Sequence, residues 1–210
     1  MLIVAVALFA FIAHSVMIGA PLADVDAAFA RWLHVRAHPA FTTFMLAVTH
    51  LHSQFALCSY AAILAIPIVR ARQWRWLATV VLAVPCGLVI NVLLKHTFER
   101  ARPTFDDPLL TLETYSFPSG HVAGSVLFYG VLVAYLLPRI ATLRLRAALV
   151  AAAITMVLLV AFSRMYLGVH YLSDVLGAAS WSLAWLALCL TVVDGVVDAV
   201  DARRAPAAGN

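Results

Sequence analysis

The chain has 210 residues, of which 64% are hydrophobic and 11% are charged, and its mean hydropathy is +0.97. The apolar share is far above that of an average soluble domain and the charged share is far below it, which excludes a soluble globular fold and indicates lipid as the solvent. A spanning helix needs about 20 mostly apolar residues, so a chain of this length has room for roughly six spans in one membrane domain.

The apolar stretches, taken in chain order, predict the membrane spans. The first runs from Leu2 to Ala20. From Asp24 to Ser53, charged residues and histidines surround short apolar pairs, which favours an interfacial helix and a re-entrant loop over a span. Five later stretches bring the predicted number of spans to six: Phe55 to Val69, Leu77 to Leu94, Val122 to Leu137, Ala147 to Phe162 and Val175 to Val193.

The predicted fold class is therefore all-α, a polytopic membrane protein of six transmembrane helices with an interfacial helix or loop after the first. Residues 1–202 form the membrane domain and residues 203–210 a disordered cytoplasmic tail. Cys58, Cys86 and Cys189 lie inside apolar stretches, without the paired spacing of a disulfide framework or a zinc site. They are predicted to be small core residues.

Basic residues occur in alternate loops, and this pattern predicts the orientation of the spans. Cytoplasmic loops of membrane proteins carry an excess of Lys and Arg. The chain's charge of +4 therefore reflects topology and does not indicate a nucleic-acid partner. Six spans with these loops inside place both termini in the cytoplasm. The arginines concerned lie between spans two and three, between spans four and five, and after span six: Arg70, Arg72, Arg75, Arg139, Arg144, Arg146, Arg203 and Arg204.

The two outward loops hold polar residues that topology does not explain. Lys95, the only lysine in the chain, lies at a membrane boundary on the side that the positive-inside rule disfavours. Arg102 and Arg164 add two cations whose guanidinium groups suit phosphate oxygens. Ser119 and Gly120 stand where span four begins, so a hydroxyl and helix N-terminal N–H groups would point at the same anion. These residues predict a phosphate cradle made without a metal.

Two histidines next to this cradle predict phosphoryl-transfer chemistry. His170 and Asp174 are four residues apart, which places them on one helical face, so the carboxylate can orient the ring and present its other nitrogen to phosphorus. His121, which comes from a different helix, can protonate the leaving oxygen and later activate water. His170 is therefore the predicted nucleophile and His121 the predicted general acid and base.

Three segments resemble, in order and in separation, the signature motifs of the type 2 phosphatidic acid phosphatase superfamily. They are Lys95 through Arg102-Pro103, Pro118-Ser119-Gly120-His121, and Ser163-Arg164 through His170 to Asp174. The architecture is most similar to compact bacterial phosphatidylglycerophosphate and undecaprenyl diphosphate phosphatases. The resemblance implies six spans, no metal and no cofactor. It also implies catalytic roles for His170, His121 and Asp174, and phosphate binding by Lys95, Arg102, Ser119, Gly120 and Arg164.

Some of these positions also have plain structural interpretations. Asp174 and Ser119 could each be a helix N-cap, alone or in addition to a role in the site. Glu99 and Arg100 are expected to form an exposed local ion pair of little energetic value.

The interfacial histidines raise the question of a metal site. The spacing of His50, His52 and His96 provides no convincing ligand set, so hydrogen-bonded side chains are favoured over metal ligands.

The predicted function is hydrolysis of a terminal phosphate from a lipid phosphate or diphosphate through a phosphohistidine. Undecaprenyl diphosphate, phosphatidylglycerophosphate, phosphatidic acid and lipid A phosphates all offer that phosphate, and no motif separates them or sets an oligomeric state. One alternative is a lipid phosphotransferase that uses the same histidine chemistry. Another is a non-catalytic lipid-binding or transport protein. The expected location is the bacterial cytoplasmic (inner) membrane, with the site on its periplasmic face and the lipid substrate and the membrane as partners.

Overall fold

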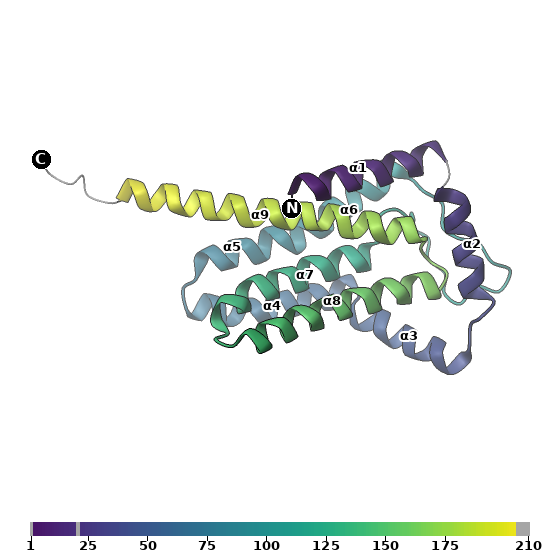
Figure 1. Ribbon diagram of the computed structural model, residues 1–210, viewed down its shortest axis with the longest axis horizontal. Coiled ribbons are helices and arrows are strands. Elements are labelled where there is room, and N and C mark those ends of the chain that lie inside the picture. Colours follow the sequence, from purple (N-terminus) through teal and green to yellow (C-terminus); the bar gives the residue numbers. More distant parts are fainter. Residues whose placement is uncertain (1, 20–21, 205–210) are drawn as a thin grey trace, which may run out of the picture.

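The structure of the chain is a computed structural model that describes residues 2–19 and 22–204 (Figure 1). Over these ranges it contains helices and no strand, in agreement with the predicted all-α class. A 3₁₀ turn, η1 (Leu137–Arg139), follows the helix that ends at Leu136. The α-helices are α1 (Leu2–Ile18), α2 (Leu22–His34), α3 (Pro39–Leu51), α4 (Gln54–Arg70), α5 (Trp74–Ala83), α6 (Pro85–Phe98), α7 (Gly120–Leu136), α8 (Leu143–Tyr166) and α9 (Leu172–Arg204).

Four helical segments of the described chain are long and apolar enough to cross a membrane. The pairs α1–α2 and α3–α4 pass the same test only as bent units, each bent by more than 40°, so the described residues hold four to six candidate spans. With this helical content the protein is an integral membrane protein. The four unbroken candidates are Trp74–Phe98, Gly120–Arg139, Leu143–Tyr166 and Leu172–Ala199.

The local sequence explains where the helices break. Pro85 has no backbone N–H to donate, so α5 ends at Ala83 and α6 begins at the proline itself, within one predicted span. Between α3 and α4, the Ser53 side chain accepts a hydrogen bond from the backbone N–H of Ala56 at 3.3 Å and caps the new helix. The segment from Asp24 to Ser53 therefore consists mainly of two helices, α2 and α3.

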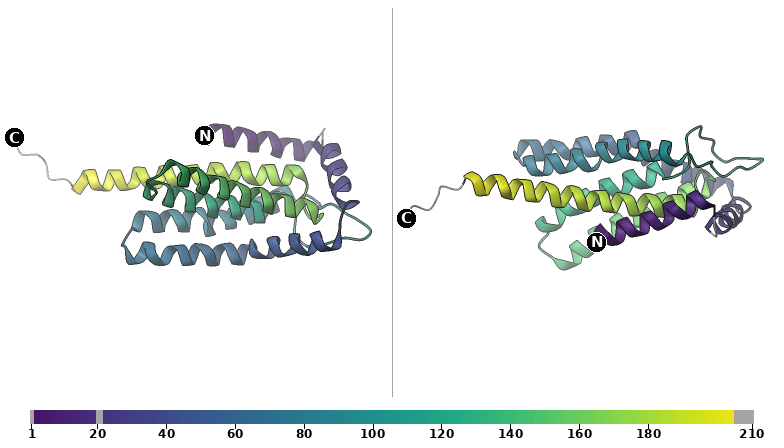
Figure 2. Two further views of the ribbon diagram at one scale, coloured as in Figure 1. Left: turned by 60° about the horizontal axis from the view of Figure 1, so that its bottom comes forward. Right: turned by 90° about the horizontal axis from the view of Figure 1, so that it is seen from above.

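α7 lies at the centre of the bundle, where α4, α5, α6, α8 and α9 pack around it (Figures 1 and 2). Its position explains its composition, since Val122, Leu127 and Val131 have no solvent-exposed surface. α1 packs along α9 on one side of the bundle. The core is thus built between helices, and the outer faces of α1 and α8 carry the exposed apolar side chains expected to face lipid.

Both predicted outward loops lie at the same end of the bundle (Figure 1). The connection between α6 and α7, residues 99–119, and the turn between α8 and α9 meet there, beside α2. The arginine-rich connections between α4 and α5 and between α7 and α8 lie at the opposite end. In the tail predicted for 203–210, Arg203 and Arg204 belong to α9, and residues 205–210 lie outside the described residues.

Candidate active site

The 99–119 connection is held in place by contacts between its two ends. The guanidinium of Arg102 donates from Nε to the carbonyl of Thr114 at 2.6 Å and from Nη2 to the carbonyl of Tyr115 at 3.0 Å. Lys95 Nζ, at the end of α6, donates to the same Tyr115 carbonyl at 2.5 Å. The basic side chains of the first motif therefore shape the loop that surrounds the site and also carry charge into it.

A tight turn between α8 and α9 presents His170. Gly168 adopts φ +71, a left-handed conformation that glycine reaches without strain, and a Cβ there would lie 2.9 Å from the Phe105 ring. His170 follows this turn, before α9 begins, and its side chain is 2% exposed. The prediction that His170 and Asp174 share one helical face is wrong in this detail, because only Asp174 is helical.

Asp174 nevertheless reaches back to the histidine. Its Oδ2 lies 3.4 Å from His170 Nδ1. It also accepts hydrogen bonds from the backbone N–H of Tyr171 at 2.8 Å and from the Ser116 hydroxyl at 2.5 Å. The Tyr171 contact is that of a capping box, in which a side chain near the helix start accepts from the cap residue. Asp174 thus makes a helix-start contact, and the same Oδ2 atom is held beside the imidazole of His170.

The other ring nitrogen of His170 faces the cationic side of the site. Nε2 lies 3.3 Å from Arg102 Nη1. Burial, together with the positive charges of Arg164, Arg102 and Lys95, lowers the pKa of His170 well below its ordinary value. The imidazole is therefore neutral at pH 7, with a lone pair available on one nitrogen.

Arg164 is almost completely buried, with 1% of its surface exposed. Its Nη1 donates to the Thr49 hydroxyl. Nε and Nη2 have no hydrogen-bond partner among the residues that the structure describes. A buried guanidinium with two unsatisfied donors is costly, and two oxygens of a tetrahedral phosphate group match that pair of donors.

The start of α7 provides the remaining predicted contacts. Ser119 occupies the N-cap position but makes no side-chain cap bond, and its buried Oγ has no partner within the described part of the chain. The interpretation of its hydroxyl as a helix cap is therefore wrong. Gly120 begins the helix, and a Cβ there would lie 2.6 Å from Gln54 Nε2, so any other residue at this position would require the end of the Gln54 side chain to move.

A cavity of about 200 Å³ gathers most of these groups. Six of the eight predicted site residues line it. Asp174 lies behind His170, and Ser119 is buried next to Gly120. The cavity is lined by Gln54, Lys95, Arg102, Leu112, Thr114, Gly120, His121, Arg164 and His170. Three cations, two imidazoles and a helix N-terminus around one small cavity are an arrangement suited to an anionic ligand and to acid–base and nucleophilic chemistry.

The predicted ion pair between Glu99 and Arg100 is wrong. Glu99 accepts a hydrogen bond from the Tyr115 hydroxyl at 2.9 Å. Arg100 turns inward and donates to Asp174 Oδ1 at 2.5 Å and to Asp26 Oδ2 at 2.8 Å. Burial opposes the charge on Arg100, but the two carboxylates outweigh it and raise its pKa.

Asp26, on α2, was missed by the sequence reasoning although the helical period marks it. Asp26, Ala30 and Leu33 follow one another at four and three residues and are the buried residues of α2. An acid on the apolar face of a short helix needs a buried partner, and Arg100 is that partner. Ser116, which bonds Asp174, carried no comparable signal because it lies in an irregular loop.

Of the three interfacial histidines, His52 has the hydrogen bonds that the sequence predicts. His52 bonds the Val48 carbonyl through Nδ1 and the Tyr129 hydroxyl through Nε2, each at 2.9 Å. Over the described ranges, no group of three or more His, Cys, Asp or Glu side chains is arranged to hold a metal ion.

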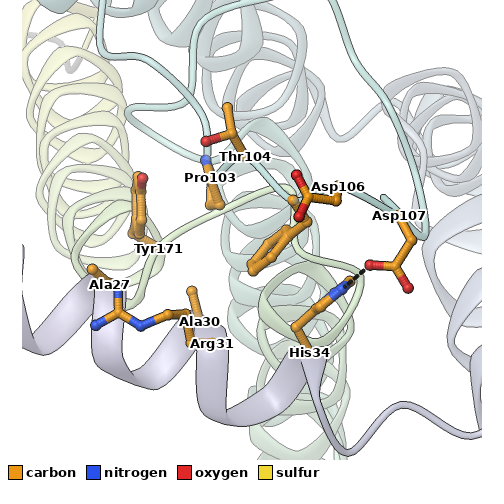
Figure 3. A pocket seen from close by; sticks show the side chains of 10 residues that line it. Ala27, Ala30, Arg31, His34, Pro103, Thr104, Asp106, Asp107 and Tyr171 are labelled. Carbon is orange, nitrogen blue, oxygen red and sulfur yellow. Dashed lines mark hydrogen bonds and ion pairs between the residues drawn. The ribbon is translucent and has the colours of Figure 1, made fainter.

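A larger cavity, of about 420 Å³, lies beside the site between α2 and the 99–119 connection (Figure 3). His34 points across it to Asp107, with 2.7 Å between Nε2 and Oδ1, and this hydrogen bond lowers the pKa of Asp107. Phe105 stacks on the same imidazole at a centroid distance of 4.0 Å. Tyr171, next to His170, forms part of its wall.

The fold and the site together define a helical integral membrane protein with a buried, cation-lined histidine site at one end of its bundle. The sequence profile of the PAP2 superfamily matches residues 74–197, and the chain belongs to that superfamily. This confirms the resemblance of the three motifs.

Two curated proteins share part of the sequence. The chain is 39% identical over 98 residues to phosphatidylglycerophosphatase B of Bacillus subtilis (strain 168), a match covering 45% of this chain and 47% of that protein. It is 30% identical over 122 residues to a probable lipid phosphate phosphatase beta of Arabidopsis thaliana, covering 52% and 55%. The chain thus spans about half the length of the curated relatives it matches.

Two solved structures share the fold. One is the crystal structure of a transmembrane PAP2 type phosphatidylglycerolphosphate phosphatase from Bacillus subtilis, with a TM-score of 0.78 and 27% identity over 93% of this chain and 96% of that one. The other is LpxE from Aquifex aeolicus, with a TM-score of 0.58 and 23% identity over 80% of this chain and 94% of that one. The second likeness shows the fold alone.

Proposed function

We propose that this protein is a membrane lipid phosphate phosphatase that works through a phosphohistidine intermediate. The observation that carries the proposal is the single cavity lined by His170, His121 and three cations, with unpartnered donors of buried Arg164 at its wall. Membership of the PAP2 superfamily and the phosphatase relatives support the same conclusion. The candidate substrates are phosphatidylglycerophosphate, undecaprenyl diphosphate and phosphatidic acid.

The first step is attack on phosphorus by Nε2 of His170, the nitrogen that faces Arg102 rather than Asp174. The N–P bond forms as the bond from phosphorus to the lipid oxygen breaks, and His121 gives that oxygen its proton. Asp174 holds the proton on Nδ1 and offsets the positive charge that develops on the ring. Lys95, Arg102 and Arg164 stabilise the charge on the phosphoryl oxygens.

The second step is hydrolysis of the phosphohistidine. His121, now neutral, takes a proton from water, whose oxygen attacks phosphorus as the N–P bond breaks. Inorganic phosphate and neutral His170 are the products. The cradle for the phosphoryl group consists of the three cations, the Ser119 hydroxyl and the N–H groups at the start of α7, which act in both steps.

Activity is expected to persist in excess EDTA and to be blocked by vanadate, because side-chain cations and a helix N-terminus hold the phosphate. The measurement is phosphate release from purified phosphatidylglycerophosphate, undecaprenyl diphosphate and phosphatidic acid in detergent, with and without chelator. Loss of activity on chelation that a divalent ion restores would contradict the mechanism. Release from none of the lipids would contradict the function.

We also propose a six-span topology with the site on the periplasmic face of the bacterial inner membrane. The spans are α1, α4, the α5–α6 segment, α7, α8 and α9, and α2 and α3 lie at the outer interface. The arginine-rich connections gather at the end of the bundle opposite the site, which supports a cytoplasmic location for that end. Both termini are then cytoplasmic.

The orientation can be tested at Pro108, an exposed residue of the 99–119 connection. After replacement of the three native cysteines by serine, Pro108→Cys is expected to react with a membrane-impermeant thiol reagent in intact cells whose outer membrane has been permeabilised. Labelling that requires disruption of the inner membrane would reverse the orientation. Arg72→Cys, in the opposite connection between α4 and α5, is the matched control and should show the converse pattern.

A further inference from the structure

A chain of charged contacts runs from the nucleophile to α2. Arg100 lies between two carboxylates, with Nη1 2.5 Å from Asp174 Oδ1 and Nη2 2.8 Å from Asp26 Oδ2. Ser173 ties the group together, since Arg100 Nη1 lies 2.6 Å from its Oγ, its backbone N–H donates to Asp26 Oδ1 at 3.0 Å and its hydroxyl donates to Asp26 Oδ2. Both carboxylates are buried, with side-chain exposures of 2% for Asp26 and 0% for Asp174. Three separate parts of the chain therefore meet in one network.

The network does not line the cavity that His121 and His170 share. Neither Asp26 nor Arg100 lines it, and α2 lies outside the segment that matches the superfamily profile. Asp26 and Arg100 differ in this respect from Arg102 and Arg164, which line the cavity. An effect of Asp26 on catalysis would therefore have to act through Arg100 and Asp174.

The charge of the network suits such an effect. Two carboxylates and one guanidinium carry a net charge of −1, and Asp174 Oδ2 presents this charge to His170 Nδ1 at 3.4 Å. Buried ion pairs contribute little net stability, because desolvation offsets their attraction, so stability alone is a weak reason for burying three charged groups. The imidazole gains positive charge when Nε2 attacks phosphorus, and a fixed negative charge on its far side stabilises that state.

We propose that Asp26 and Arg100 are positioning residues for the nucleophile, a proposal that rests on the proposed phosphatase function. Arg100 fixes Asp174 through Oδ1 and leaves Oδ2 to orient His170. Asp26 fixes Arg100 and supplies the second carboxylate that keeps the network negative. Without Asp26, Arg100 would neutralise Asp174, and the support for positive charge on the ring would weaken.

The test compares Asp26→Asn, Arg100→Gln and the double variant with wild type in phosphate release from short-chain phosphatidic acid. Asp26→Asn is expected to lower kcat about tenfold and Arg100→Gln about 100-fold, the range found for groups that orient a reacting side chain. KM and the inhibition constant of inorganic phosphate should stay within about twofold, because neither residue contacts the phosphate. The double variant should be no slower than Arg100→Gln, since Asp26 acts through Arg100.

The matched control is Asp24→Asn, which removes an exposed acid two residues earlier on the same helix and should leave kcat unchanged. Ser173→Ala adds a variant that buries no new charge, and it should lower kcat severalfold at constant KM. This variant keeps the proposal testable if Asp26→Asn fails to fold, as judged by size-exclusion chromatography in detergent.

Three outcomes would each overturn the proposal and leave the phosphatase function standing. They are a wild-type kcat in folded Asp26→Asn, a loss of kcat in the double variant equal to the product of the two single losses, and a rise in KM in place of a fall in kcat. Wild-type kcat in Ser173→Ala would do the same. Absence of phosphate release by the wild-type chain from phosphatidic acid and from the other two candidate lipids would overturn the function, and the positioning proposal with it.

Discussion

His170→Ala is expected to abolish both phosphate release and the covalent phosphoenzyme. The imidazole is the group whose unprotonated nitrogen faces the cations at the cavity wall, and its place at the end of the α8–α9 turn is set by Gly168 and Asp174. Loss of a nucleophile that acts in a covalent mechanism costs about 10⁴-fold or more in turnover. The cradle itself stays intact in this variant, so binding of inorganic phosphate should change much less than kcat.

The measurement is a pair of assays on the same preparation. Phosphate release gives kcat, and rapid acid or base quench with a labelled lipid phosphate gives the phosphoenzyme, which is stable in base and labile in acid when the link is to histidine. His50→Ala removes an exposed histidine of α3 and serves as the matched control. A base-stable phosphoenzyme in His170→Ala would assign the nucleophile to another residue.

His121→Ala is expected to produce a loss that depends on the leaving group. His121 lines the same cavity as His170 and comes from the first turn of α7. Its proposed role is to protonate the leaving oxygen, and general acid catalysis contributes about 100- to 10,000-fold. A lipid alcohol of high pKa needs this proton, so phosphatidic acid should lose activity within that range. With a diphosphate substrate, the leaving group is a lipid phosphate that needs less protonation. Activity on this substrate should therefore fall much less.

The ratio of the His121→Ala rates on phosphatidic acid and on undecaprenyl diphosphate is the quantity that distinguishes the role of His121 from that of His170. The phosphoenzyme of His121→Ala should remain detectable with undecaprenyl diphosphate, and it should accumulate because its hydrolysis also uses His121 as the base. Equal losses for the alcohol and the diphosphate would remove His121 from the acid role. A phosphoenzyme in His170→Ala together with none in His121→Ala would show that the two roles are reversed.

The meeting of most predicted residues around one cavity could be predicted because short motifs carry them at fixed places relative to the spans. Alternating topology brings the end of one span and the start of the next to the same face, so Lys95, Gly120 and His170 had to approach one another once the spans were assigned. The three cationic side chains among them then predict an anionic ligand. Position in the membrane and residue type were sufficient to predict which residues meet and which kind of ligand suits them.

The α2 segment shows where local pattern was insufficient. Its mixed composition predicted an interfacial element, and the structure has a helix there. The sequence alone paired Arg100 with its neighbour Glu99, because adjacent opposite charges are the simplest local solution. The partner that the structure shows, Asp26, is 74 residues away along the chain. No spacing rule connects the two positions, and only the packing of α2 across the end of the bundle brings them together.

The sequence by itself determined the membrane class, the convergence of the outward loops and the residue types of the anion site, because apolar runs and charged motifs are local properties. The tertiary structure decided which atoms contact one another. It placed His170 in a turn instead of a helix, gave Asp174 Oδ2 to the imidazole and Oδ1 to Arg100, and left the Ser119 hydroxyl without a cap bond. These outcomes depend on backbone direction and on contacts between distant segments, since a buried polar group takes the partner that packing brings within reach.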